Sequence, residues 1–296
     1  MAAFPAPGFT GSPLVRIDIE RDNQAYFAEQ LASLSARLLR LDGLKPVVEP
    51  DGALSWGSLA EADPDADLAL LGLLDGKPRF VSLSRVEPSV EHPLAAIGLA
   101  SSMPPGDAAT YAAARSLVDW HNRHRFCANC GRPTFVKRSG WARFCLKDGG
   151  GCGTEHFPRT DPVVIMLAEH GGRVLVGRNI RAPARFYSAL AGFLEVGESI
   201  EEAVARELHE EAGVVVKAVR YITSQPWPLP SQLMIGCIAT VESDALTLDV
   251  NELGDAIWVD RDQVRAALAG EDDALFQMRF PLAIAHTLLT AWVNGA

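Results

Sequence analysis

The stretch from Gly192 to Val214 reads GFLEVGESIEEAVARELHEEAGV and sets seven glutamates against a single arginine. Apolar residues nevertheless recur at the spacing of one helix face, at Ile200, Ala203, Val204 and Leu208. Ser199 and Glu202 match a capping box, which marks the start of a helix, and Gly213 stands where a left-handed residue ends one. We therefore predict a glycine-bounded loop followed by a helix of about thirteen residues.

The glutamates of this predicted helix crowd one face near its C-terminal end. Glu207 is followed by Glu210 and Glu211 at the spacings i, i+3 and i, i+4, which place the three carboxylates side by side. Like charges at that spacing repel, and the C-terminal half of a helix prefers cations. A divalent cation held between the carboxylates explains the arrangement, and hard oxygen ligands suit Mg²⁺ or Mn²⁺. The alternative is an acidic amphipathic helix that faces water.

Length and charge limit the remaining possibilities. A chain of 296 residues is long enough for two domains and a small third module. Its net charge of −10 argues against a general nucleic-acid binder, and an anionic substrate would need local cations or a metal ion. No apolar run approaches the roughly 20 residues that span a bilayer, and the N-terminus lacks the pattern of a signal peptide. We expect a cytoplasmic protein with no membrane partner.

Four of the five cysteines fall within one loop-rich segment at the spacing of a metal site. A C-x2-C pair is followed by two more cysteines, as in a two-knuckle zinc ribbon. The predicted ligands of one structural Zn²⁺ are Cys127, Cys130, Cys145 and Cys152. The second knuckle is widened to C-x6-C, whose glycines could loop out; a vestigial site without metal and a catalytic zinc are the alternatives. His121 and His124 are substitute ligands or, as we favour, caps of a helix end.

The chain divides into three predicted domains, and its fold class is α/β. Residues 1–125 read as an α/β domain with a hairpin turn at Asp75–Gly76, a helix capped by Asp107 and no catalytic constellation. Residues 126–158 form the zinc ribbon. Residues 159–296 alternate apolar strands with helices, so an α/β/α sandwich with a mixed sheet is expected around the acidic helix. Cys237 lies in one of these strands and is expected in the core.

The acidic segment resembles the Nudix box, G-x5-E-x7-R-E-U-x-E-E-x-G-U with U aliphatic. Every fixed position is matched, by Gly192, Glu198, Arg206, Glu207, Leu208, Glu210, Glu211, Gly213 and Val214. The resemblance implies a Nudix hydrolase, which uses Mg²⁺ or Mn²⁺ to cleave a nucleoside diphosphate linked to another moiety. It implies Glu207 and Glu211 as metal ligands and Glu210 as a residue that assists the metal or the attacking water. Arg206 would orient the glutamates together with Glu198.

A second motif, SQPWPLPSQLM, spans residues 224–234. Its three prolines predict a stiff, extended loop on which Trp227 could stack an aromatic ring; the alternative is a surface loop whose tryptophan is anchored in the core. The motif resembles SQPWPFPxS, the signature of NADH pyrophosphatases, which also carry a four-cysteine ribbon before the Nudix domain and a divergent N-terminal domain. The resemblance therefore covers essentially the whole chain and implies a Nudix-like α/β domain for residues 1–125.

The resemblance to that family implies hydrolysis of NADH or NAD⁺ to nicotinamide mononucleotide, reduced or oxidised, and AMP, by a homodimer. It implies Glu252 as a further metal ligand and substrate contacts from Phe157, Ala285 and a wall made of Gln225, Pro226, Trp227, Pro228, Leu229, Pro230, Ser231 and Gln232. Leu229 replaces a phenylalanine of the signature, and Gly140 stands where an acidic residue is expected. The alternatives are removal of NAD caps from RNA, hydrolysis of another dinucleotide such as ADP-ribose, and a non-catalytic nucleotide sensor.

Overall fold

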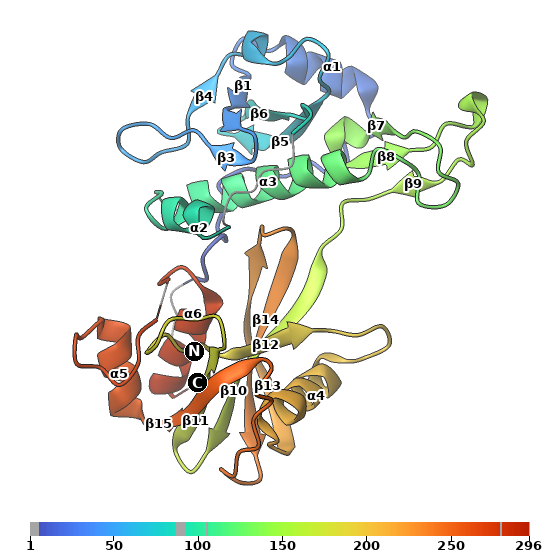
Figure 1. Ribbon diagram of the computed structural model, residues 1–296. Helices are drawn as coiled ribbons and strands as arrows, with labels where there is room; N and C mark the ends of the chain where they lie inside the picture. Colours follow the sequence, from blue (N-terminus) through green and yellow to red (C-terminus); the bar gives the residue numbers. More distant parts are fainter. Residues whose placement is uncertain (1–5, 87–92, 105, 279, 296) are drawn as a thin grey trace. The chain divides into compact units, whose positions relative to one another are not determined.

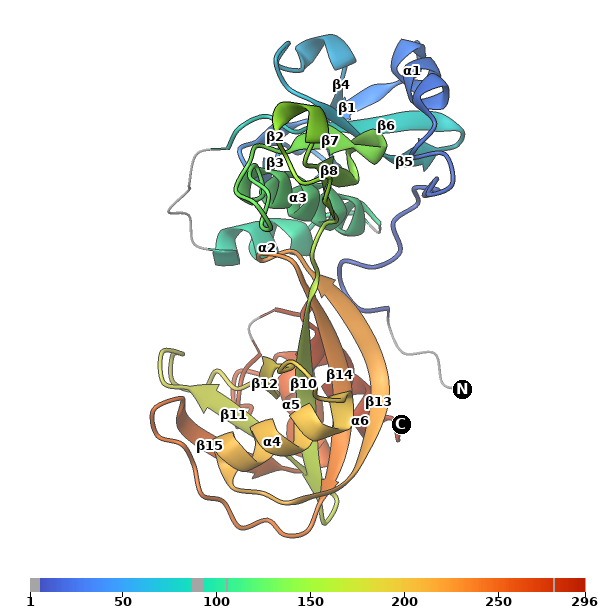
Figure 2. The same cartoon turned by 90° about the vertical axis from the view of Figure 1, so that its right-hand side faces the viewer.

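The computed structural model describes residues 6–86, 93–104, 106–278 and 280–295 of the chain. Its internal contacts divide the chain into two compact units. The C-terminal unit consists of Met1–Thr10, Asp161–Trp227 and Gln232–Ala296, and the N-terminal unit consists of Gly11–Thr160 and Pro228–Ser231. Figures 1 and 2 show the elements of each unit. Within the described ranges, no helix combines the length and the apolar character needed to cross a bilayer.

A six-stranded mixed sheet forms the centre of the C-terminal unit (Figures 1 and 2). Its strands are β10 (Asp161–His170), β11 (Arg173–Asn179), β12 (Leu190–Phe193), β13 (Val216–Trp227), β14 (Gln232–Val241) and β15 (Leu253–Val259). Their order is β13-β14-β10-β11-β15, and β12 pairs with β10. The central strand β10 runs parallel to β14 and antiparallel to both β11 and β12, which share its other edge.

Both faces of this sheet are buried. Successive residues of its central strand point to opposite sides, and each side packs into its own apolar core. Val164, Met166 and Ala168 belong to an apolar core shared with α4, whereas Ile165 and Leu167 belong to a second core shared with α5 and α6. The helices are α4 (Ile200–Ala212), α5 (Arg261–Ala269) and α6 (Ile284–Val293). The predicted α/β/α sandwich with a mixed sheet is thereby confirmed, and Cys237 lies fully buried in its core.

The acidic helix α4 forms as its sequence predicts. The Ser199 side chain accepts a hydrogen bond from the backbone of Glu202, whose carboxylate accepts one in return, and Gly213 ends the helix with φ +71°. The proline-rich motif differs from its prediction, because most of it is strand and only Pro228–Ser231 form a turn. Strand β13 continues to Trp227 and pairs with β14 down to Gln232. Proline is tolerated there because β13 is the edge strand of the sheet.

The N-terminal unit contains a four-stranded sheet in the order β4-β1-β6-β5, in which β1 and β6 are parallel. Its elements are α1 (Gln24–Ala32), β1 (Arg37–Leu39), β2 (Leu41–Asp42), β3 (Lys45–Pro46), β4 (Trp56–Gly57), β5 (Leu68–Leu74), β6 (Lys77–Ser82), α2 (Pro93–Ser101) and α3 (Asp107–Arg123). The predicted turn at Asp75–Gly76 is confirmed, and both residues have positive φ. The prediction that Asp107 caps this helix was wrong. Gly106 holds that position, and the Asp107 carboxylate instead accepts the backbone N–H of Leu54 at 2.8 Å.

A three-stranded ribbon sheet completes the N-terminal unit (Figure 1). Its strands are β7 (Phe135–Lys137), β8 (Ala142–Phe144) and β9 (Glu155–His156). Buried His121 of α3 joins helix and ribbon: Arg143 lies 3.1 Å from Nδ1, and Nε2 lies 2.8 Å from the carbonyl oxygen of Gly140. Burial lowers the pKa of His121 to about 4, so the neutral ring accepts from Arg143 and donates to Gly140. His124 is the C-terminal cap of α3, as predicted, but the same prediction for His121 was wrong, because that residue lies within the helix and bonds to the ribbon.

Candidate active site and zinc centre

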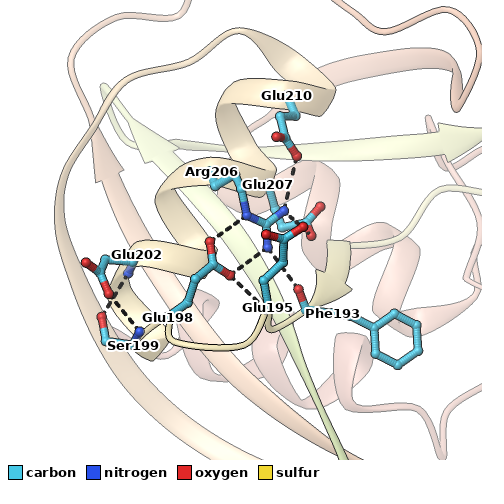
Figure 3. Close-up of polar contacts among 8 residues, drawn as sticks. All are labelled: Phe193, Glu195, Glu198, Ser199, Glu202, Arg206, Glu207 and Glu210. Atoms are coloured by element: carbon cyan, nitrogen blue, oxygen red, sulfur yellow. Dashed lines mark hydrogen bonds and ion pairs between the residues drawn. The ribbon is translucent and has the colours of Figure 1, made fainter.

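Arg206 connects the loop before α4 to the carboxylates of the helix (Figure 3). Its Nε and Nη2 donate to the two carboxylate oxygens of Glu198, at 2.6 and 2.8 Å. Nη2 also donates to the backbone carbonyl of Phe193 at 2.9 Å, while Nη1 donates to Glu207 at 2.8 Å and to Glu210 at 3.1 Å. A planar guanidinium that donates to several groups in fixed directions holds all of them in one geometry.

The contact between Arg206 and Glu198 is an ion pair throughout the physiological pH range. The guanidinium, together with the backbone N–H of Glu195, lowers the pKa of Glu198 to about 2. The carboxylates of Glu198, Glu207 and Glu210 in turn raise the pKa of Arg206. Only 18% of the Glu198 side chain and 13% of the Glu207 side chain are exposed, so water competes weakly for these bonds. The pair therefore fixes the loop rather than taking part in proton transfer.

Gly192 leaves the space that the Glu207 carboxylate occupies. A Cβ atom at position 192 would lie 1.9 Å from the carboxylate carbon and from Oε1 of Glu207. The backbone of Gly192 cannot retreat freely, because β12 pairs it with Val164 of the central strand. The first glycine of the acidic motif is thus required by a close approach of backbone and side chain.

Glu211 is the most deeply buried carboxylate of α4, with 7% of its surface exposed. Burial raises its pKa to about 8, together with the negative charges of Glu207, Glu252, Asp249 and Glu210. A carboxyl group in this position favours its neutral form unless a cation compensates the surrounding charge. The helix therefore holds one acid that is close to half protonated at a mildly alkaline pH.

This carboxylate set fits a divalent cation with few protein ligands. Glu207 and Glu211 lie one helical turn apart, and Glu252, in the turn before β15, adds its charge to theirs. In the described part of the chain, only the cysteines bring three or more potential ligand atoms within 4.8 Å of one another, so the carboxylates are spread more widely. Mg²⁺ suits such a set, because it keeps several waters and is commonly held by one or two carboxylates.

Two contributions to this site were missed by sequence reasoning. Asp249 adds negative charge beside Glu211, and its backbone N–H donates to the carbonyl oxygen of Glu211 at 3.0 Å. The available signal was the short acidic spacing between Asp249 and the predicted ligand Glu252. Phe193 contributes a carbonyl oxygen to Arg206, and no side-chain pattern reveals a backbone acceptor of this kind.

The four predicted zinc ligands come together in the ribbon. All four Sγ atoms lie within 4.8 Å of one another, and the Cys127–Cys152 and Cys130–Cys145 pairs are each separated by 3.5 Å. These separations are too long for disulfides but close to the roughly 3.8 Å edge of a tetrahedral zinc thiolate site. The glycine-rich insertion loops out as expected, since the backbone N–H of Cys152 returns to 3.4 Å from the Cys145 sulfur.

In the proline-rich motif, the side chain of Gln225 makes its hydrogen bonds within the protein. Gln225 is completely buried; its amide nitrogen donates to the carbonyls of Gly8 and Leu282, and its oxygen accepts the backbone N–H of Ile284. This side chain is therefore not available to a nucleotide and instead caps the start of α6. Trp227 is half-buried, and its ring is nearly perpendicular to that of Phe9, with the two centroids 5.7 Å apart.

The other predicted substrate residues lie in three places. Pro228–Ser231 form the turn between β13 and β14 and group with the N-terminal unit, where Arg115 of α3 donates to the carbonyl of Pro228 and Ser231 donates to that of Arg159. Phe157, 53% exposed, follows β9 and lies under the guanidinium of Arg138. Ala285 is buried in α6, next to the residue that Gln225 caps.

Two family models match adjoining parts of the chain. Residues 122–157 match the NADH pyrophosphatase zinc ribbon domain, and residues 158–278 match the NUDIX domain. Nudix hydrolases use Mg²⁺ or Mn²⁺, and the matched ribbon includes all four clustered cysteines. Among solved structures, a NUDIX hydrolase from Nitrosomonas europaea is 21% identical with a TM-score of 0.44, over 57% of this chain and 90% of that one.

Curated relatives extend the similarity into the N-terminal unit. The protein named NAD-capped RNA hydrolase NUDT12 of Homo sapiens is 38% identical over 264 residues, which cover 87% of this chain and 54% of that protein. The protein named NAD-capped RNA hydrolase NudC of Mycobacterium bovis (strain BCG / Pasteur 1173P2) is 36% identical over 272 residues, 87% of this chain and 86% of that protein. The chain thus spans about half the length of the human relative and most of the mycobacterial one.

Proposed function

Because the chain belongs to the NADH pyrophosphatase family of Nudix hydrolases, we propose that it hydrolyses the pyrophosphate bond of NADH or NAD⁺ to AMP and nicotinamide mononucleotide, reduced or oxidised. One observation carries the proposal: a zinc ribbon of the NADH pyrophosphatase type leads directly into a Nudix domain at residue 158. The complete set of motif glutamates favours an enzyme over a nucleotide sensor: Glu207 and Glu210 of α4 and Glu198 of the preceding loop all bond to Arg206.

We assign the roles in catalysis to the residues around α4. Glu207, Glu211 and Glu252 would hold the metal, and Glu210, which is 58% exposed, would assist it or accept a proton from the attacking water. When bound, Mg²⁺ or Mn²⁺ supplies charge neutralisation at the diphosphate and lowers the pKa of a bound water. Arg206 keeps Glu207 and Glu210 in register with the loop through Glu198.

The set of substrate-contacting residues stays a proposal, in which Gln225 and Ala285 have a different role from the one predicted. Trp227 and Phe157 would offer aromatic faces to the two rings of the dinucleotide, and the turn Pro228–Ser231 would border them. Gln225 and Ala285 would act indirectly, because one caps α6 and the other is buried beside that cap.

Product identification tests the proposal. Protein incubated with NADH and Mg²⁺ should release AMP and reduced nicotinamide mononucleotide in equal amounts, as measured by liquid chromatography and mass spectrometry. Glu207→Gln should abolish this release, whereas Glu201→Gln, which alters an exposed glutamate outside the fixed motif positions, should keep it. Formation of free nicotinamide and ADP-ribose would contradict cleavage at the pyrophosphate.

A second candidate function uses the same bond in a larger substrate. Both reported relatives are named NAD-capped RNA hydrolases, which favours removal of NAD caps from RNA 5′ ends as an activity of this chain. The values of kcat/KM for NADH and for an NAD-capped RNA, measured at matched concentrations, would separate the two. Hydrolysis of ADP-ribose in the same assay tests the third dinucleotide substrate.

Three further properties are proposals of this kind. We expect a homodimer, which light scattering in solution would detect, and a cytoplasmic location, which fractionation of the source cells would test. The division into domains 1–125, 126–158 and 159–296 predicts that proteolysis cuts first near residues 125 and 158. Stable fragments with other boundaries would contradict it.

A further inference from the structure

One face of the ribbon sheet carries phenylalanines on two of its strands and at their flanks. Phe135 of β7 is directly opposite Phe144 of β8, and Phe126 is bridged to Pro133, two residues before Phe135. Residues opposite each other on paired strands, and residues two apart on one strand, share a face. Phe144 is in turn opposite Glu155, and Phe157 lies two residues further along. We call this set the phenylalanine face: Phe126, Phe135, Phe144 and Phe157.

The other face of the same sheet is covered by the protein itself. Val136, Arg143 and His156 alternate with the residues of the phenylalanine face. Arg143 reaches His121 of α3 at 3.1 Å, and Thr134 donates to the carbonyl of His124 at 2.9 Å. The ribbon therefore packs on α3 through this side. On the phenylalanine side Ala142, opposite Lys137, is also buried, whereas the outer rings are exposed.

Three of the four rings of the phenylalanine face are exposed, and Phe144 is half-buried. Phe126 is 66% exposed, Phe157 is 53% exposed and Phe135 is 51% exposed. A single exposed apolar residue is ordinary, but three large exposed rings on one small sheet indicate a surface that binds something. Phenylalanine is suited to stacking on flat rings, because its face is available to any aromatic partner.

The ribbon is basic within an acidic protein. Residues 122–157 contain seven basic and two acidic side chains, while the whole chain has a net charge of −10. A zinc ion with four thiolates adds a charge of −2 and leaves the ribbon positive. Lys137 shares the phenylalanine face. Arg125 and Arg132 are the neighbours of Phe126 and Pro133 and alternate to the other side of the sheet, where Arg125 lines a hollow with His121 and Arg143. All three cations are exposed, and none forms an ion pair with another residue that the structure describes.

We propose that the phenylalanine face binds the single-stranded RNA that follows the dinucleotide in an NAD-capped transcript. The inference rests on the proposed function, since Phe157 is the ring predicted to meet the dinucleotide and the face continues from it. Aromatic rings that stack on bases, beside cations that contact phosphates, are the shared chemistry of proteins that bind single strands without sequence preference. The face binds RNA by stacking and charge, so it tolerates any base.

Charge favours RNA over a second copy of this chain as the occupant. Two identical basic faces brought together would repel, and a homodimer buries the same patch of both subunits when its interface is isologous. A polyanion gains from the same charges. The surrounding acidity of the chain confines such binding to the ribbon.

A double variant, Phe135→Ala with Lys137→Ala, tests the face without touching the proposed dinucleotide site. Its kcat/KM for an NAD-capped single strand of about 15 nucleotides should fall roughly tenfold, while that for NADH should stay within about twofold of wild type. Binding of the same RNA without its cap, measured by fluorescence anisotropy, should weaken by a similar factor and depend less on salt. The matched control is Lys217→Ala with Tyr221→Ala, an exposed cation and an exposed ring on β13.

Equal losses on NADH and on capped RNA, or no loss on either, would overturn the inference. So would uncapped RNA that fails to bind the wild type, or a dimer that dissociates in the double variant, since the face would then be a contact between copies. Zinc content and thermal unfolding of the variant should match wild type. A wild type that leaves NADH intact would refute the proposed function alone, because the anisotropy measurement still decides whether the face binds RNA.

Discussion

At the scale of single residues, the site is held in an arrangement that costs stability when no cation is present. Glu211 is buried among like charges, and its pKa is raised to about 8. An unfolded glutamate has a pKa of about 4.3, so between that pH and about 8 the folded chain retains a proton that the unfolded chain releases. The metal-free protein therefore loses stability as the pH rises through this window.

Replacement of this acid should separate stability from activity. Glu211→Gln removes the buried charge, and each unit of pKa shift corresponds to about 1.4 kcal/mol. We expect the variant to melt higher than wild type in chelator at pH 9, by several degrees, with a smaller difference at pH 5. Its hydrolytic rate should fall by about three orders of magnitude, because a charged metal ligand is lost. A variant that melts lower than wild type at pH 9 would contradict the assignment of the raised pKa.

A second residue-scale prediction concerns Gly192. Gly192→Ala should leave the fold intact, since the added methyl meets the flexible end of Glu207 rather than backbone. The displaced carboxylate loses its bond to Arg206, so kcat should drop roughly 10- to 100-fold with little change in the melting temperature. Gly98→Ala in α2 is the matched control, because its added methyl meets open space. Equal kinetics of the two variants would show that the position of Glu207 is unimportant.

At the scale of elements, the ribbon depends on its metal. Its strands β7, β8 and β9 are two or three residues long, and its few buried side chains include Cys127 and Cys145. Cys145→Ser should abolish zinc binding, release the ribbon from its fold and lower the melting temperature of the N-terminal unit, because the metal supplies folding free energy. Atomic absorption and thermal unfolding check this. Well-folded wild-type protein without zinc would refute a structural role for the metal.

The elements that the sequence could predict are those whose signals are local. The start and end of α4 follow from Ser199, Glu202 and Gly213, which act within one helical turn. The proline-rich motif was predicted as a loop, because its pairing with β14 depends on the sheet that surrounds it. The cap of α6 by Gln225 is non-local in the same way. Gly106 rather than Asp107 caps α3, because that position has a left-handed backbone conformation that glycine adopts most readily.

At the scale of the whole molecule, the beginning of the chain is part of the C-terminal unit. Gly8 accepts a hydrogen bond from Gln225, and Phe9, 4% exposed, packs against Trp227. Deletion of residues 1–10 should therefore destabilise the C-terminal unit by about 3 kcal/mol or more, as a lost core phenylalanine does. Deletion of residues 1–5 is the control, since it leaves these contacts in place. Superimposable denaturant curves for the two truncations would contradict the packing of Phe9.

Attachment of Gly8 to a glutamine 217 positions later in the chain has a consequence for biosynthesis. On the ribosome, Gly8 lacks its partners until Gln225 and the beginning of α6 have been translated. The ribbon and its neighbours can mature earlier, because their contacts lie mostly within residues 11–160. Closure of so long a loop is entropically slow. The segment around Gly8 thus reaches its folded position only after most of the chain that follows it has been made.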